Sequence, residues 1–234
     1  MEEKLNAITL KAVDYGESDK ILTLFSLEKG VISATVKGVK KDKAKLKFVA
    51  EPFCFAELIT AEKVGRRSIT NASCHKSYFN LCQNLNSYFC ACVIAEFVTL
   101  FFKDAEEGLF ADFVLSLENM LKGISFSTLV KFILKGLAYA GYGLDFSGCS
   151  KCAELIENRV FLDVDSSCFL CENYALENAL EFKISTYTRL FEINNTPFDK
   201  LDLEQENTKN CLRLLDNYIS HRLGFKLKSL QFVL

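Results

Sequence analysis

The pattern of hydrophobic and polar positions changes near residue 80. Before that point, short apolar stretches separated by turns predict five β-strands, at residues 5–13, 20–27, 31–36, 52–61 and 68–77. Five short strands in so little chain favour a small closed sheet, because closure removes exposed strand edges. We therefore expect residues 1–80 to form a five-stranded barrel of the OB type.

After residue 80 the apolar residues recur at helical spacing, which predicts helices at residues 88–101, 110–121, 127–140 and 204–223. Between the third and fourth of these the helical pattern is interrupted, and residues 158–165 alternate like a strand of a small hairpin. Helical signals resume near Leu176, and the apolar tail 226–234 is expected to dock on the helices. The fold class is therefore α+β, with a mainly helical domain at 81–234 after the barrel.

Four cysteines interrupt the helical part in two C-x-x-C pairs that are fifteen residues apart: Cys149, Cys152, Cys168 and Cys171. This spacing predicts a closed tetrahedral zinc site, in which each pair forms a tight turn that directs two thiolates at one ion. Four thiolates leave no coordination position open for water. We therefore expect one structural Zn²⁺, held by a zinc-finger insertion at about residues 146–174, and no zinc catalysis.

The start of the chain has no signal-peptide pattern. Ten cysteines in a chain without such a signal favour a reducing compartment, and we therefore expect a cytoplasmic protein. The longest apolar block, at residues 88–102, is interrupted by Glu96 and is too short to span a membrane. Catalytic motifs such as a phosphate-binding loop or a nucleophile elbow are missing from the sequence, and there are only two histidines, His75 and His221. The sequence therefore favours a binding protein over an enzyme.

Positive charge is concentrated at the beginning of the chain. Residues 1–80 contain 14 Lys and Arg against 10 Asp and Glu, a net charge of +4, whereas the remainder contains 14 against 20, a net charge of −6. Because the basic stretch lies between strands of the predicted barrel, we expect contacts with DNA phosphates from Lys37, Lys40, Lys41, Lys43, Lys45, Arg66 and Arg67. Single-strand binders add aromatic stacking, and Phe25, Phe48, Phe53 and Phe55 are either stacking candidates or barrel core.

An alternative interpretation makes the lysines an ordinary solvated loop. The protein would then be a zinc-stabilised interaction scaffold without a direct role in DNA binding, and its binding face would lie on the Phe-rich helical domain. The salt dependence of DNA binding separates the two hypotheses, because phosphate contacts weaken as salt rises.

Several short motifs resemble the RecO family of bacterial recombination mediators and DNA repair proteins: Tyr15-Gly-Glu-Ser-Asp19, Glu28-Lys-Gly30, the lysine-rich stretch, Pro52-Phe53 and the ending Leu223-Gly-Phe-Lys. Many members also carry a zinc finger where the four cysteines lie. Where relatives usually have glycine, after the second cysteine and before the third, this chain has Ala153 and the run Asp165-Ser166-Ser167.

The resemblance implies a non-catalytic, nucleoid-associated protein that binds single- and double-stranded DNA and anneals complementary strands. It implies two protein partners. With RecR, the protein would help to load RecA on DNA coated by single-strand-binding protein, and it would bind the acidic C-terminal tail of that protein. In this chain Arg213 and Arg222 of the last predicted helix are the candidate residues for the tail.

Overall fold

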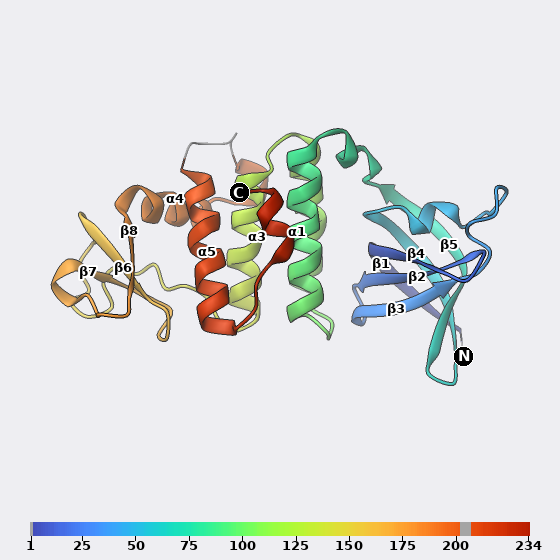
Figure 1. Ribbon diagram of the computed structural model, residues 1–234, viewed down its shortest axis with the longest axis horizontal. Coiled ribbons are helices and arrows are strands. Elements are labelled where there is room, and N and C mark those ends of the chain that lie inside the picture. Colours follow the sequence, from blue (N-terminus) through green and yellow to red (C-terminus); the bar gives the residue numbers. More distant parts are fainter. Residues whose placement is uncertain (1, 202–206) are drawn as a thin grey trace.

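The computed structural model describes residues 2–201 and 207–234. Figure 1 shows an elongated molecule with a five-stranded sheet at one end, a small three-stranded sheet at the other, and helices between them. The fold is α+β, and the change of pattern near residue 80 coincides with the change from strands to helices.

The N-terminal strands form a closed barrel in the order β1-β2-β3-β5-β4. β1 is antiparallel to both β2 and β4, and β3 meets β5 in a short parallel pairing. The sequence-based prediction of five strands is confirmed, with small differences at their ends. The strands are β1 (Glu2–Tyr15), β2 (Asp19–Ser26), β3 (Gly30–Val36), β4 (Cys54–Lys63) and β5 (Arg66–Ser77).

Alternation along these strands separates two faces. In β4 every second residue from Cys54 to Thr60 is buried, as period-two geometry requires of a strand with one face in the core. The barrel interior is filled by small and aliphatic side chains, among them Ala7, Leu22, Leu24, Val36 and Leu58. The 3-10 helix η1 (Lys47–Ala50) adds the buried Val49 to this interior.

The helical region packs α1 (Leu85–Phe101), α2 (Glu107–Leu121) and α3 (Phe126–Tyr139) against one another, and α4 (Ile184–Asn195) and α5 (Thr208–Leu223) against α3. The predicted helices are confirmed where they lie in described residues. The expected start of the last helix, at residue 204, lies outside the described residues. Its expected end is confirmed, because Gly224 follows α5 in a left-handed conformation (φ 69°).

The outer face of the barrel is packed on the helices through aromatic rings. Phe25 lies 5.3 Å from Phe110 and 5.9 Å from Phe113 between ring centroids, and Phe55 lies 5.7 Å from Phe110. The backbones also approach closely, since a Cβ on Gly30 would come within 2.3 Å of the Asp104 carbonyl oxygen. The barrel and the helical region therefore share a continuous core.

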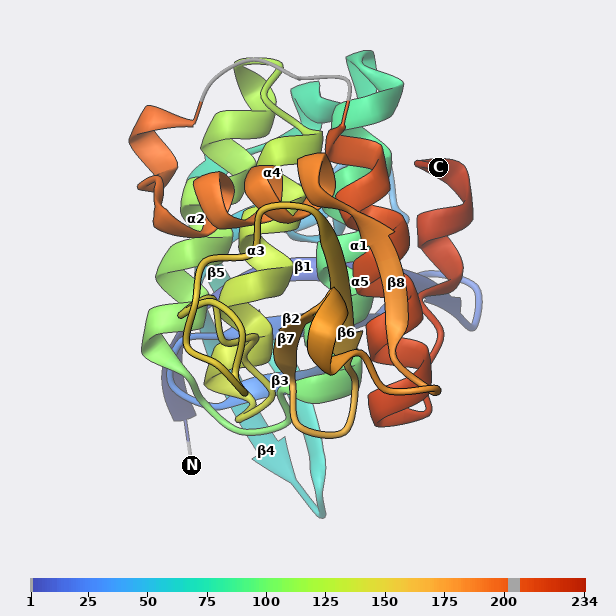
Figure 2. The ribbon, with the colours of Figure 1, turned by 90° about the vertical axis from the view of Figure 1, so that its left-hand side faces the viewer.

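The far end of the molecule holds the sheet β7-β6-β8, made of β6 (Arg159–Asp163), β7 (Cys168–Cys171) and β8 (Leu180–Lys183). Figure 2 shows this sheet in front of the helices with α4 beside it. The hairpin predicted at 158–165 corresponds to β6 and its turn to β7. The prediction that helix resumes near Leu176 was wrong, because Leu180–Lys183 pairs with β6 as a third strand before α4 begins.

The C-terminal tail docks as predicted. Leu227 and Leu230 are buried, and both carboxylate oxygens of Glu96 in α1 accept hydrogen bonds from the tail, from the backbone N–H groups of Lys228 and Ser229. Within residues 2–201 and 207–234, no helix is long and apolar enough to cross a membrane.

Candidate functional site

The lysine-rich loop between β3 and η1 is held against the turn between β1 and β2. The N–H of Gly38 donates a 2.7 Å hydrogen bond to Asp19 Oδ1, and the Lys40 N–H donates to the Ser18 carbonyl at 2.9 Å. The Lys40 side chain pairs with Asp14 at 2.9 Å. The Gly38 hydrogen bond, followed by that from the Ser18 hydroxyl, lowers the pKa of Asp19. Asp19 therefore anchors the loop.

Four of the predicted DNA-binding lysines, Lys37, Lys41, Lys43 and Lys45, have exposed side chains on this loop. In the part of the chain that the structure describes, none of these four ammonium groups forms an ion pair with a carboxylate. Lys40 differs from them because Asp14 balances its charge. The loop thus presents several positive charges with few local counter-charges.

A groove of about 750 Å³ crosses the barrel next to the loop. Strands β2 to β5, the end of β1 at Tyr15 and the turn between β4 and β5 supply its walls. Of the seven predicted phosphate-binding residues, Lys37, Arg66 and Arg67 line it, and the four lysines at 40, 41, 43 and 45 do not. In Figure 1 the loop projects from the barrel at the upper right, away from the helices, and the β4–β5 turn projects downward.

The two arginines of the β4–β5 turn have different environments. The Arg66 side chain is exposed and has no ion pair among the described residues. Arg67 is only 11% exposed, and its Nη2 lies 3.0 Å from Glu62 and 3.4 Å from Glu3. Arg66 is therefore available to an anionic ligand, whereas two carboxylates already neutralise Arg67.

Two groove residues were missed by the sequence analysis. Tyr15 ends β1 with 53% of its surface exposed, and Lys63 ends β4 with an exposed side chain. Both lie directly beside a turn that the sequence did reveal, namely Gly16-Glu-Ser and Val64-Gly65. The useful signal was the position next to those turns, since OB folds bind ligands with the loops between strands 1–2 and 4–5.

The phenylalanines considered for base stacking are not in the groove. Phe25 and Phe53 are buried where the barrel meets the helices, Phe55 contacts Phe110, and Phe48 packs on the barrel interior. Hydrophobic alternation alone does not distinguish the barrel interior from an outer face that a second layer covers.

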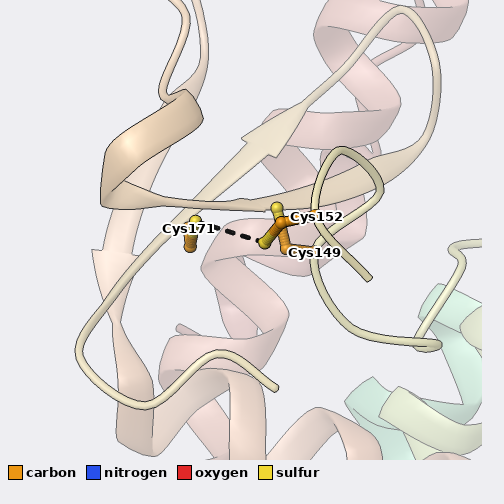
Figure 3. Close-up of side chains that lie close together, drawn as sticks. All are labelled: Cys149, Cys152 and Cys171. Atoms are coloured by element: carbon orange, nitrogen blue, oxygen red, sulfur yellow. Dashed lines mark hydrogen bonds between the residues drawn. The ribbon is translucent and has the colours of Figure 1, made fainter. Parts of the chain in front are cut away.

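A second cluster, of three thiols, lies where the turn at Cys149 meets the small sheet at Cys171 (Figure 3). The sulfurs of Cys149, Cys152 and Cys171 lie within 4.8 Å of one another, with 4.0 Å between those of Cys152 and Cys171. Thiolates bound at about 2.3 Å to one tetrahedral zinc ion are roughly 3.8 Å apart. The three thiols therefore fit a common metal ion.

The environment of Cys149 favours a thiolate. Burial alone would raise its pKa, but the backbone N–H groups of Cys152, Cys171 and Lys151 donate hydrogen bonds to its sulfur and lower its pKa to about 6. These donors are directed at the sulfur by a tight turn, closed by a 2.8 Å hydrogen bond from the Ala153 N–H to the Cys149 carbonyl. The first C-x-x-C therefore forms the turn that its spacing predicts.

The second C-x-x-C departs from the predicted turn. Cys168 through Cys171 form strand β7, which pairs with β6 at every residue. Residues three apart in a regular strand point to opposite faces, so Cys168 does not join the other three sulfurs. Its thiol donates to the Ser166 carbonyl at 3.2 Å instead. Strand pairing in the β6–β7 hairpin thus separates the fourth predicted ligand from the cluster.

Two residues of the finger adopt the left-handed conformation that glycine favours. Ala153 has φ 60° and Ser167 has φ 59°. L-residues pay a steric cost in this region, because Cβ approaches the backbone oxygen. The finger therefore keeps a glycine-type backbone with residues that strain it.

The arginines considered for a protein partner lie apart on α5. Arg213 lines a cavity of about 350 Å³ between β8 and α5, beside the apolar Phe182 and Leu214, and bonds to Asn210 at 2.8 Å. The Arg222 guanidinium lies 5.6 Å from the centroid of the Tyr142 ring and outside that cavity.

Comparison with known proteins gives a consistent result. Residues 1–78 match the family model described as Recombination protein O N terminal, and residues 82–231 match Recombination protein O C terminal. The chain belongs to the recombination protein O (RecO) family. The two matched regions of this RecO chain meet where the 3-10 helix η2 (Phe79–Gln83) connects the barrel to α1.

Similar proteins cover almost the full length. DNA repair protein RecO of Clostridium perfringens strain 13 is 29% identical, over 97% of this chain and 95% of the relative. DNA repair protein RecO of Caldicellulosiruptor saccharolyticus is 28% identical, over 98% of this chain and 96% of the relative. DNA repair protein RecO of Shouchella clausii is 25% identical, over 100% of this chain and 94% of the relative. The similarity therefore extends over most of the length of each of these relatives.

Proposed function

We propose that this RecO-family chain is a non-catalytic DNA-binding protein of recombination and repair, with its DNA site on the barrel. The observation that carries the proposal is the groove. It is bordered by the exposed Lys37, Lys63 and Arg66 and lies next to a loop of exposed lysines. Such cations neutralise phosphates without reading sequence, as binding to arbitrary DNA requires.

The barrel topology supports assignment to the OB class. Its closed five-strand order, with β1 paired to β2 and β4, brings β2, β3, the strand ends beside the β1–β2 turn and the β4–β5 turn around one groove. In OB folds these elements bind oligonucleotides. We assign DNA binding to residues 1–80 and protein contacts to residues 81–234.

The further steps of the proposal come from family membership. DNA held on the barrel is annealed to a complementary strand, and RecR joins the protein in loading RecA on DNA coated by single-strand-binding protein. The elongated shape supports this division, since the barrel and the small sheet lie at opposite ends (Figure 1). Proteins bound to the helical end leave the groove open.

For the acidic tail of single-strand-binding protein we propose the cavity beside Arg213. It combines a guanidinium with the apolar Leu180, Phe182 and Leu214, and a tail that ends in Phe needs a cation for its carboxylates and an apolar surface for its ring. Arg222 lies outside this cavity on the same helix and serves as a more distant cation.

We propose one structural zinc ion, held by Cys149, Cys152 and Cys171 and completed by Cys168 after a change in that side chain's direction. When bound, the ion would cross-link the turn at Cys149 to strand β7. The N–H groups directed at Cys149 would keep its sulfur ionised. The proposed role is to stabilise the finger.

The proposed function is tested by DNA binding at several salt concentrations. Simultaneous replacement of Lys41, Lys43 and Lys45 by Ala should weaken binding equally for unrelated sequences. On single strands it should flatten the slope of log K against log salt by roughly 2, if each lysine neutralises one phosphate. The matched control replaces the exposed Lys103, Lys122 and Lys200 of the helical region. Equal effects of the two triple variants would contradict the assignment and favour the scaffold hypothesis.

A further inference from the structure

One aromatic ring on the barrel differs from the others. The Tyr15 side chain is 53% exposed at the rim of the groove, and within residues 2–201 and 207–234 it forms no hydrogen bond and contacts no other ring. By contrast, Phe25, Phe53 and Phe55 each contact another ring at the junction with the helices. The fold makes no visible use of the Tyr15 ring, so its face is open to a ligand.

The groove behind this ring has two kinds of surface. Ile21, Ala34 and Ala61 contribute apolar atoms to its wall. The cations Lys37, Lys63 and Arg66 contribute charge at the borders. A single strand matches both, because its bases offer flat apolar faces and its phosphates offer charge. In a duplex the faces of internal bases are stacked and unavailable, and only phosphates and groove edges remain.

The lysine loop lacks this second kind of surface. Lys41, Lys43 and Lys45 are exposed outside the groove, and the nearest ring in sequence, Phe48, packs on the barrel interior. Such a loop contacts phosphates of single and double strands alike. The barrel therefore carries two adjacent surfaces of different chemistry.

We propose that Tyr15 stacks on a base and makes the groove a single-strand subsite, while the lysine loop contacts the phosphates of either single or double strands. The inference rests on the proposed DNA-binding function and adds to it the residue that selects the form of DNA. It gives an annealing protein one place for an unpaired strand and a neighbouring place for the backbone of a second strand.

The first experiment compares affinities of Tyr15→Ala and Tyr15→Phe for an oligothymidine and for a duplex closed at each end by a non-nucleotide linker, which has neither an unpaired base nor an open terminal base pair to stack on. Tyr15→Ala should weaken oligothymidine binding by about fivefold to a hundredfold and leave the closed duplex unchanged. Tyr15→Phe, which keeps the ring, should bind both as the original protein does. An equal loss on both DNAs, or no loss on either, overturns the proposal.

A second readout reports the stacking itself. The chain has no tryptophan, so Tyr15→Trp creates a protein with one indole. Saturating oligothymidine should quench its fluorescence, and the closed duplex should not. The matched control is Tyr174→Trp, because Tyr174 is similarly exposed (48%) but lies in the small sheet region at the opposite end. The proposal is overturned if saturating oligothymidine does not quench the fluorescence of Tyr15→Trp, or if it quenches that of the control Tyr174→Trp equally.

The two proposals fail differently. If the unmodified protein binds no DNA at low salt, the DNA-binding function itself is wrong. If it binds both DNAs and the triple lysine variant weakens both, but Tyr15→Ala changes neither, then the function stands and the stacking role of Tyr15 is rejected. Thermal unfolding of each variant excludes a change in stability as the cause.

Discussion

The barrel and the zinc-finger region, at opposite ends of the molecule, are stabilised in different ways. The barrel closes its hydrogen-bonded ladder around an apolar interior and packs an aromatic face on the helices. The finger has three short strands, three clustered thiols and two strained residues, Ala153 and Ser167. A small sheet buries too little surface to compensate easily for such strain. The comparison indicates that the barrel is stable through packing, and we expect the finger to depend on the proposed metal ion.

The two ends also differ in how charge is used. On the barrel, Lys41, Lys43 and Arg66 remain without ion pairs among the described residues. On the small sheet, Arg159 is paired with Glu181 at 2.6 Å. Unbalanced charge costs a little stability and leaves a surface ready for phosphate, whereas balanced charge serves the fold. Exposed charge therefore suggests a binding site only where its counter-charges are missing.

The largest expected effect is the loss of metal from the finger. Cys149→Ser, or a chelator, should abolish stoichiometric zinc and raise amide hydrogen exchange across residues 146–183, while exchange in residues 2–77 stays unchanged. Structural zinc contributes apparent binding energies of about 10 kcal/mol or more, so local order should be lost. The control is Cys82→Ser, which alters an exposed thiol outside the cluster. Increased exchange throughout the barrel would show that the two ends are not independent.

Cys168→Ser sharpens the same comparison. If Cys168 completes the site, its replacement should lower zinc affinity, although less than Cys149→Ser does, because Cys149 alone receives three N–H hydrogen bonds. Competition with a metal indicator measures both affinities. An unchanged affinity would mean that the site uses only the three thiols that the structure brings together.

The next effect concerns the junction that joins the barrel to the helices. Gly30→Ala should lower the free energy of unfolding by about 2–4 kcal/mol, because Gly30 has φ 69° and the new Cβ would collide with the Asp104 carbonyl. Gly65→Ala has a similar φ of 70° but no atom within 4 Å of the new Cβ, so it should cost only about 1–2 kcal/mol. Equal losses in urea unfolding would show that the junction is not tightly packed.

Much of the barrel and part of the finger were predictable, for identifiable reasons. Alternation determines strands locally, so β1 to β5 were found, and helical periodicity found α1 to α3. The course of the chain after the finger was not predictable. Leu180–Lys183 is too short to show a period, and it becomes a strand only because β6 provides a partner.

The candidate sites, too, were predictable only in part. Lysine clustering is visible in the sequence, but Arg67 and Arg66 are indistinguishable there, and only the positions of Glu3 and Glu62 separate them. Similarly, C-x-x-C spacing predicts a turn at Cys149, yet the ladder between β6 and β7 extends Cys168–Cys171. Local motifs therefore identify the residue types, and long-range pairing decides which of them meet.

A smaller effect should come from relieving strain in the finger. Ala153→Gly should raise the stability of the zinc-loaded protein by about 0.5–1 kcal/mol, since glycine adopts positive φ without the Cβ clash. Ser167→Gly should show a similar gain only relative to Ser167→Ala, because both variants lose the 2.6 Å hydrogen bond between the Ser167 and Tyr218 hydroxyls. Ser167→Ala is the control, because it removes the hydroxyl but keeps the Cβ. Thermal unfolding at fixed zinc concentration measures all three. A gain from Ser167→Ala equal to that from glycine would attribute the effect to the hydroxyl and not to the backbone.

The smallest effect is the acid sensitivity of the lysine loop. Asp19 accepts the Gly38 N–H, and this bond, followed by that from the Ser18 hydroxyl, lowers the pKa of Asp19 below its ordinary value of 3.8. A carboxyl group with a lowered pKa in the folded state stabilises that state above its unfolded pKa and loses this contribution as pH falls through the folded value. Anchoring of the loop should therefore be constant from pH 8 to about pH 5 and weaken only below the ordinary range of aspartate. Amide exchange at Gly38, corrected for the intrinsic dependence on pH, reports the anchoring directly. Asp19→Asn should remove this acid sensitivity, because an amide does not titrate in that range. A loop that loosens between pH 8 and 6 would show that some other group holds it, and would end the role of Asp19 in presenting the lysines to DNA.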